Sequence, residues 1–331
     1  MSGRNVAYQL RPNKHVERLL FVELLEKICQ NQTSSYAYIS MGGPQLDDHR
    51  LFYQTLGITK LFSFEEDAIV YKRQLFNQRP SCIKCLPIPI DEFVSEFDSF
   101  LENEAISDKK LIVWLDYAST KRREQLIEYQ ILLDKLQEQD VVKITLNANP
   151  KTLGEAQSKE TQDSLFKRRL EKIRGEIGEY LSPDITSDDM TGLRLVPVLC
   201  HAVEVAAEKG TNARSRLKPL LLSLFVYQDG EHQMLTTTVR LTNNSDIDQY
   251  KANLNWEYLP SSWQDVTKIN IPALSAKERL VIESQLPVVD YSALHDNLPF
   301  RLHTDENISL EMLKEYARHY KRYPSYFQVV L

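Results

Sequence analysis

The sequence predicts an α/β fold with a mostly parallel sheet and helices on both faces, plus a smaller α+β C-terminal domain. Between residues 36 and 146, short apolar runs alternate with helix-length stretches, a pattern typical of units in which consecutive strands are parallel. With 331 residues, of which 42% are hydrophobic and 26% charged, the chain can bury a full core. We expect two domains, residues 1–150 and 151–331.

The first domain is expected to begin with a helix over residues 15–30, where apolar residues recur at helical spacing. Five strands are expected to follow, at residues 36–40, 60–64, 81–87, 111–115 and 141–146. The helices between them are expected at residues 47–56, 68–77, 91–102 and 120–137.

The second domain is expected to begin after a polar linker or loop at residues 151–162. Helices are expected at residues 164–180 and 196–209, and again at residues 310–323. Between them, residues 220–241 form two apolar runs around Gln228-Asp-Gly-Glu. A glycine supplies the positive φ of a tight turn, so these runs predict a β-hairpin.

Composition excludes several classes of protein. A net charge of −6 argues against non-specific nucleic-acid binding by the whole chain, although a local basic face remains compatible with it. Four scattered cysteines do not suit a secreted disulfide framework. The sequence has no run of 18 apolar residues and no apolar leader, which favours a cytoplasmic protein that does not span a membrane.

Three of the predicted strands end in residues suited to a ligand. The first ends in Ser40-Met-Gly-Gly-Pro, where Gly42 and Gly43 let the backbone approach a ligand closely. The alternative is a plain strand-to-helix turn with Pro44 near the helix start. Because ligands of parallel sheets bind at the carboxyl ends of strands, these endings predict one shared pocket.

The second strand ends in Glu65-Glu66-Asp67. Glu65 lies about 20 residues past the glycines, where a carboxylate in such folds accepts hydrogen bonds from ribose hydroxyls. Glu66 and Asp67 are expected to begin the next helix, where negative charge favours the helix dipole.

The fourth strand ends in Asp116-Tyr117. A carboxylate can accept a hydrogen bond from a substrate amine, and a tyrosine ring can stack on a planar substrate. The alternative is that Asp116 caps the following helix and Tyr117 packs on a neighbouring loop.

These endings together resemble a class I S-adenosylmethionine-dependent methyltransferase domain, over approximately residues 30–150. Four phrases resemble, more closely, uncharacterised prokaryotic proteins grouped as O-methyltransferases: residues 8–14, Gly-Gly-Pro at 42–44, Ser-Phe-Glu at 63–65 and Trp-Leu-Asp-Tyr at 114–117. The resemblance implies a Rossmann-like domain with S-adenosylmethionine as cofactor and an oxygen or nitrogen atom as methyl acceptor. It implies the following sites: Gly42 and Gly43 near the methionine part of the cofactor, Glu65 on the ribose, Asp91 on the adenine side, and Asp116 and Tyr117 facing the acceptor.

The sequence also departs from that family. Ser40 and Met41 stand where small residues are usual, and Asp116-Tyr117 lacks the prolines of the Asn/Asp-Pro-Pro-Tyr motif of amino-methyltransferases. The alternative is therefore a catalytically degenerate protein that binds nucleic acid or a protein partner in a multi-gene system, such as bacterial antiviral defence. A further alternative is a pocket for another nucleotide, such as a dinucleotide.

Basic residues are concentrated in the second half of the chain. They form one group on the helix near residue 170 and a second group, interleaved with tyrosines, near the C-terminus: Lys167, Arg168, Arg169, Lys172 and Arg174, then Tyr316, Arg318, His319, Tyr320, Lys321, Arg322, Tyr323 and Tyr326. Aromatic and cationic residues together suit nucleic acid. The alternative is solvated cations with tyrosines docked on the hairpin. A protein partner or a second copy of the chain is also compatible with this domain.

No metal site is expected. Cys82 and Cys85 have the spacing of a zinc pair, but no second pair follows, so they are interpreted as core residues. His49, one helical turn past the glycines, is either a proton acceptor or a partly exposed helix residue.

Overall fold

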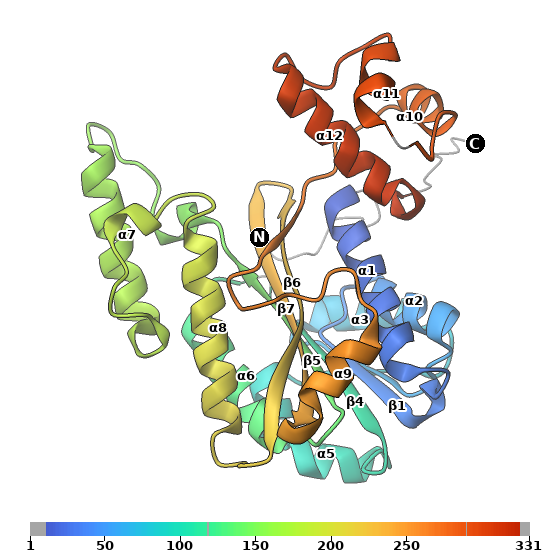
Figure 1. Ribbon diagram of the computed structural model, residues 1–331. Helices are drawn as coiled ribbons and strands as arrows, with labels where there is room; N and C mark the ends of the chain where they lie inside the picture. The colour runs from blue at the N-terminus through green and yellow to red at the C-terminus, as the bar shows by residue number, and fades with distance from the viewer. Residues whose placement is uncertain (1–10, 118, 289, 325–331) are drawn as a thin grey trace. The chain divides into compact units, whose positions relative to one another are not determined.

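The protein is built around one eight-stranded sheet of order β3-β2-β1-β4-β5-β7-β6-β8 (Figure 1). The structure is a computed structural model that describes residues 11–117, 119–288 and 290–324. The strands are β1 (Tyr36–Ser40), β2 (Leu61–Phe64), β3 (Ile83–Leu86), β4 (Lys110–Asp116), β5 (Val141–Asn147), β6 (Leu217–Asp229), β7 (His232–Asn243) and β8 (Thr267–Ile269).

Twelve α-helices are found among the described residues. They are α1 (Pro12–Cys29), α2 (Asp47–Leu56), α3 (Ala68–Asn77), α4 (Ile90–Ser95), α5 (Phe97–Asn103), α6 (Arg122–Lys135), α7 (Gln162–Ile177), α8 (Leu195–Thr211), α9 (Ile247–Leu254), α10 (Ala276–Glu283), α11 (Tyr291–Asn297) and α12 (Glu306–His319). No helix in the described ranges combines the length and the apolar character needed to cross a membrane.

The predicted mostly parallel sheet is confirmed. Strand β1 pairs in parallel with β2 and β4, β2 pairs in parallel with β3, and β4 pairs in parallel with β5. The five predicted strands agree with the observed ones within two residues at each end. They were recognisable because strands of a parallel sheet are covered on both faces and form nearly continuous apolar runs.

The predicted hairpin is also confirmed, with Gly230 in its turn at φ +62°. However, a separate α+β domain containing it is not confirmed. Strand β7 pairs antiparallel with β5, from Val141 opposite Arg240 to Asn147 opposite Met234. The hairpin therefore extends the main sheet, and it satisfies backbone groups of β5 that would otherwise form an open edge.

Contacts between residues divide the chain into two compact units, which differ from a division at residue 150. The first unit contains residues 22–226 and 232–267, of which all but Ala118 are described. The second unit contains residues 6–21, 227–231 and 268–331, of which 11–21, 227–231, 268–288 and 290–324 are described.

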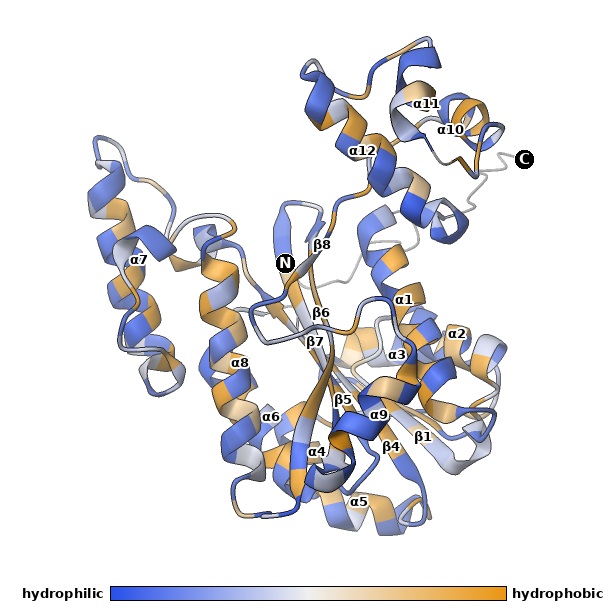
Figure 2. Ribbon diagram, in the orientation of Figure 1, coloured by the Kyte–Doolittle hydropathy of each residue, from blue (hydrophilic) through white to orange (hydrophobic). Residues whose placement is uncertain are grey.

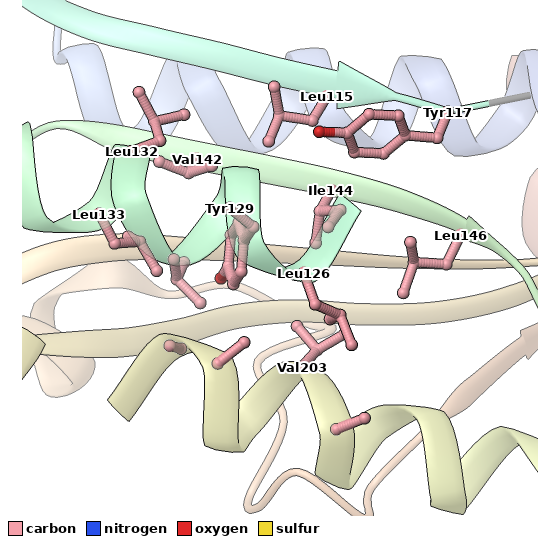
Figure 3. Packing of buried hydrophobic residues seen from close by; sticks show 14 of the residues in the cluster. Leu115, Tyr117, Leu126, Tyr129, Leu132, Leu133, Val142, Ile144, Leu146 and Val203 are labelled. Atoms are coloured by element: carbon pink, nitrogen blue, oxygen red, sulfur yellow. The ribbon is translucent and has the colours of Figure 1, made fainter. Parts of the chain in front are cut away.

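The core of the first unit lies on one face of its sheet, beneath α4, α5, α6 and α8. Figure 3 shows side chains of β4, β5, α6 and α8 that meet there. Hydrophobic and hydrophilic residues alternate along α8 (Figure 2), as expected for a helix with one buried side. The labelled residues of this face are Leu115, Tyr117, Leu126, Tyr129, Leu132, Leu133, Val142, Ile144, Leu146 and Val203.

The opposite face of the same sheet is covered by α2, α3 and α9. The ring of Tyr38 on β1 lies 4.3 Å from the ring of Phe52 on α2, measured between centroids. On β7, the Arg240 guanidinium lies 4.1 Å from the centroid of the Tyr250 ring on α9. Helices therefore cover both faces, as predicted.

In the second unit, tyrosines predicted either to contact nucleic acid or to dock on the hairpin pack against α10. Tyr316 of α12 is fully buried, and its hydroxyl donates a hydrogen bond to Glu283 of α10. The Nε of Arg279 donates to the Tyr316 hydroxyl at 3.2 Å, and its guanidinium lies 4.3 Å from the centroid of the Tyr323 ring. Tyr326 lies outside the described residues.

The close contact of α6 with α8 depends on Gly210. A Cβ at this position would lie 2.5 Å from the carbonyl oxygen of Gln130. We expect Gly210→Ala to lower the free energy of unfolding by about 1–3 kcal/mol, because the two helices must separate. Urea unfolding measures this change.

The control is Gly175→Ala on α7, where an added Cβ meets no atom of the described residues within 4 Å. This substitution should leave stability unchanged or raise it by up to about 1 kcal/mol through helix propensity. Equal losses in both variants would contradict the close-contact explanation.

Asp140, immediately before β5, should make stability depend on pH. Its carboxylate accepts hydrogen bonds from the backbone amides of Leu111 and Gln137, both at 2.7 Å, and burial raises its pKa from 3.8 to about 6. The folded protein therefore holds this proton more tightly than the unfolded chain. As the pH rises from about 4 to about 6, ionisation of Asp140 should lower the free energy of unfolding, by at most about 3 kcal/mol.

Urea unfolding of the wild type and Asp140→Asn across this pH range tests the expectation. The variant should be less stable throughout, because its amide cannot accept both backbone hydrogen bonds, and it should lose this part of the pH dependence. The same slope in both proteins would show that another group is responsible.

Candidate active site

The three strand endings singled out in the sequence meet at one edge of the sheet. Ser40, the last residue of β1, pairs with Ser63 of β2 on one side and Trp114 of β4 on the other. The strand order proceeds from β1 to β2 and β3 in one direction, and to β4 and β5 in the other. The carboxyl ends of β1 and β4 thus form a topological switch point, the usual ligand site of an open parallel sheet.

The glycine turn after β1 packs tightly against β2 and α3. A Cβ at Gly42 would lie 2.3 Å from the Oγ of Ser63 and 3.0 Å from the ring of His49. The Gly42 amide donates a hydrogen bond to the Ser63 hydroxyl at 3.1 Å, and the Gln74 side chain donates to the Gly42 carbonyl oxygen. Gly42 is therefore needed for a close approach inside the protein.

Gly43 is placed differently from Gly42. It is partly exposed, and its carbonyl oxygen accepts a hydrogen bond from Leu46 at 3.1 Å. Two residues separate Pro44 from the first residue of α2, Asp47. Pro44 is therefore not at the helix start, where the alternative placed it. Of the two glycines, Gly43 is the one open to a ligand.

The end of β2 places Glu65 at the same edge, half-buried. Its carboxylate accepts a hydrogen bond from the amide of Asp67 at 2.8 Å, and the carboxylate of Asp67 caps α3 by accepting from Ile69 and Val70. The predicted role of Asp67 in starting the helix is confirmed. A carboxylate has room for further hydrogen bonds, so Glu65 can also accept from ligand hydroxyls.

Asp91 lies in the first turn of α4, five residues past the end of β3, and is exposed. Its charge acts on Glu128 of α6, which places it on the same rim as the β4–α6 connection.

Asp116 and Tyr117 follow one another but lie on opposite faces of the sheet. Tyr117 belongs to the apolar cluster beneath α6, beside Leu115 (Figure 3). Asp116 pairs with Thr145 of β5 and shares the other face with Trp114. Side chains alternate along a strand, so the two residues cannot approach one ligand from the same side.

The phenol of Tyr117 is engaged inside the protein, where it donates a hydrogen bond to the carboxylate of Glu128. Burial and the adjacent negative charge raise the pKa of Tyr117 well above its ordinary value, so the phenol stays neutral. Burial also raises the pKa of Glu128, while the hydrogen bond from Tyr117 lowers it.

The face that carries Asp116 also holds buried polar residues that the sequence reasoning missed. The indole of Trp114 donates to Thr145 at 2.9 Å, and the ammonium of Lys143 lies 3.8 Å from the centroid of the Trp114 ring. Lys143 and Thr238 pair across β5 and β7, and both are fully buried. A lysine within the apolar run of residues 141–146 was the signal that could have revealed this face.

His49 is fully buried, so the alternative of a partly exposed helix histidine is wrong. One ring nitrogen lies 2.9 Å from the carbonyl oxygen of Phe62, and burial lowers the pKa of the ring. The imidazole is therefore neutral and packs between the glycine turn and Tyr38, 5.0 Å from the Tyr38 ring between centroids.

The cations of α7 interact with neighbouring groups in the first unit. Arg168 pairs with Glu160 at 2.8 Å, Lys167 pairs with Asp163 at 2.7 Å, and Arg169 donates to the Gly154 carbonyl at 2.9 Å. Lys167 and Arg168 therefore form surface ion pairs, as the solvated alternative expects, whereas Arg169 is buried. Nucleic-acid binding stays a prediction.

Cys82 and Cys85 are free thiols, as are Cys29 and Cys200. Across the described ranges, no group of three or more metal-binding side chains comes together.

Comparison with known proteins identifies the family. A family model described as "Putative O-methyltransferase" matches residues 6–331, almost the whole chain. The chain belongs to this family, so the resemblance inferred from the strand endings is confirmed. No curated protein matches the sequence.

Solved structures resemble the chain only distantly. They include the N-methyltransferase NodS from Bradyrhizobium japonicum, at 10% identity and TM-score 0.34, covering 69% of this chain and 97% of that one. A protein of the duf574 family from Streptomyces avermitilis has 9% identity and TM-score 0.39, covering 69% and 82%. A 16S rRNA (adenine(1408)-N(1))-methyltransferase from Catenulisporales acidiphilia, solved with its cosubstrate SAM, has 8% identity and TM-score 0.33, covering 66% and 91%.

Tyr117→Phe tests whether the phenol holds the β4–α6 connection. The variant leaves the half-buried Glu128 carboxylate without its donor, so we expect a loss of about 2 kcal/mol in the free energy of unfolding by urea. The matched control is Tyr129→Phe in the same cluster, because the buried Tyr129 hydroxyl has no partner among the described residues. A loss in the control as large as in Tyr117→Phe would contradict this role.

Proposed function

We propose that the protein is an S-adenosylmethionine-dependent methyltransferase that methylates an oxygen atom of its acceptor. The observation that carries the proposal is the register of β1 with β2, which brings the glycine turn next to Glu65 at the switch point. Membership in the family described as "Putative O-methyltransferase" supports the reaction class and the oxygen acceptor.

The residues at this edge fit such a cofactor. Glu65 would accept hydrogen bonds from the ribose hydroxyls, Gly43 would lie against the methionine part with Gly42 shaping the turn, and Asp91 would lie on the adenine side. The Asp67 amide holds the Glu65 carboxylate in place at 2.8 Å, so its orientation is set before a ligand arrives.

When bound, the cofactor supplies an electrophilic methyl group. The protein's own part is mainly alignment of the acceptor, which accounts for much of the rate of a displacement reaction. Asp116, on the polar face at the end of β4, would orient the acceptor hydroxyl by accepting a hydrogen bond from it, and its carboxylate would take up the hydroxyl proton as the new O–C bond forms. Tyr117 would act from the other face, by holding the β4–α6 connection through Glu128.

Calorimetric titration with S-adenosylmethionine and S-adenosylhomocysteine tests the proposal. We expect micromolar binding by the wild type, and a loss of at least about 100-fold in Glu65→Ala, because two hydrogen bonds to a charged group are removed. Glu66→Ala is the control: Glu66 is an exposed neighbour, and its removal should leave the Kd unchanged.

A folded wild type that binds neither molecule would contradict the methyltransferase proposal. Binding that survives in Glu65→Ala would remove only the ribose assignment.

A further inference from the structure

We propose that Gln74 of α3 is a positioning residue that fixes the glycine turn for the cofactor. This inference rests on the proposed function. Gln74 lies 32 positions from Gly42 in the sequence, on the helix that follows Glu65.

The geometry is a closed ring of hydrogen bonds among Gly42, Ser63 and Gln74. The Gly42 amide donates to the Ser63 hydroxyl at 3.1 Å, and the Ser63 hydroxyl donates to the Gln74 Oε1 at 3.2 Å. The Gln74 Nε2 then donates to the Gly42 carbonyl oxygen. Ser63 and Gln74 are fully buried, so the ring is shielded from water and each member has its partners.

A second hydrogen bond from the same face of α3 supports the turn. Asn77, one helical turn past Gln74, donates from its side chain to the Pro44 carbonyl oxygen at 2.9 Å. Residues three positions apart share a helix face, so one face of α3 forms hydrogen bonds to the turn at both Gly42 and Pro44.

The other end of α3 is connected to Glu65. Asp67 caps the helix and its amide donates to the Glu65 carboxylate at 2.8 Å. One helix therefore sets both the glycine turn and the carboxylate assigned to the ribose, and fixes their separation.

The ring also determines which backbone groups of the turn face a ligand. The amide and the carbonyl of Gly42 both form hydrogen bonds within the ring. Gly42 therefore shapes the turn but offers no hydrogen bond to a ligand. The amide of Gly43 has no partner among the described residues, and it remains as the donor for an anionic group. The Gly43 amide shares a planar peptide unit with the Gly42 carbonyl, which accepts a hydrogen bond from Gln74. The ring therefore also fixes the direction in which the Gly43 amide points.

The experiment compares Gln74→Met with Gln130→Met. Methionine keeps the length of glutamine and removes both of its hydrogen bonds. Gln130, on α6, accepts from the Tyr180 hydroxyl at 3.1 Å and lies outside the site, so it matches the loss of a side-chain hydrogen bond. We expect the Kd for S-adenosylhomocysteine to rise at least about tenfold in Gln74→Met and to stay unchanged in Gln130→Met.

Three further readouts separate positioning from general stability. Hydrogen exchange at the Gly42 amide should accelerate in ligand-free Gln74→Met and not in Gln130→Met. Ser63→Ala should weaken binding similarly, and the double variant should lose little more, because the residues act as one network. In Gln74→Glu, the variant-to-wild-type ratio of Kd should fall towards one as pH is lowered from about 8 to about 5, since a protonated carboxyl can replace the amide donor.

A folded Gln74→Met that binds with the wild-type Kd, while the wild type binds normally, would overturn the positioning role and leave the proposed function intact. A wild type that binds neither S-adenosylmethionine nor S-adenosylhomocysteine would overturn the function, and the positioning role with it.

Discussion

The candidate site depends on the parallel pairing of β1 with both β2 and β4. Parallel neighbours end at the same edge of a sheet, and the strand order reverses at β1, so the connections leaving β1 and β4 turn away from each other. That geometry brings together a glycine turn, a carboxylate from β2 and a carboxylate from β4. The hairpin of β6 and β7 supports this arrangement at a distance, because it pairs with β5 and keeps the central strands away from an edge.

The glycine turn after β1 has only two glycines, and it is held in place by the close packing of Gly42 against Ser63 and Gln74. Gly42 lacks a Cβ where one would collide with Ser63, and this lets its backbone join a buried ring with Ser63 and Gln74. Each residue of the ring has hydrogen-bond partners, so these polar groups are buried without the free-energy cost of an unpaired donor or acceptor. The turn is held by α3, and the N-cap residue of that helix, Asp67, donates its amide to Glu65. The cofactor position proposed for this edge depends on that connection.

The two faces of the sheet have different roles. The face beneath α6 and α8 is apolar and includes Tyr117, whose phenol donates a hydrogen bond to Glu128. The opposite face carries Asp116, Trp114 and Lys143 and is polar at its carboxyl edge. Two residues adjacent in sequence therefore have different surroundings, one suited to hold a helix and the other to meet an acceptor.

The sequence by itself determined the local elements: apolar runs predicted the strands of residues 36–146, Gly230 predicted the hairpin turn, and Asp67 predicted a helix start. These features depend on neighbouring residues, and each carries its own signal along the chain. Only the tertiary structure decided that the hairpin joins the main sheet, that Asp116 and Tyr117 separate, and that Gln74 reaches Gly42 across 32 positions. Such contacts form between residues distant in sequence, and their energies depend on burial and orientation that no local pattern records.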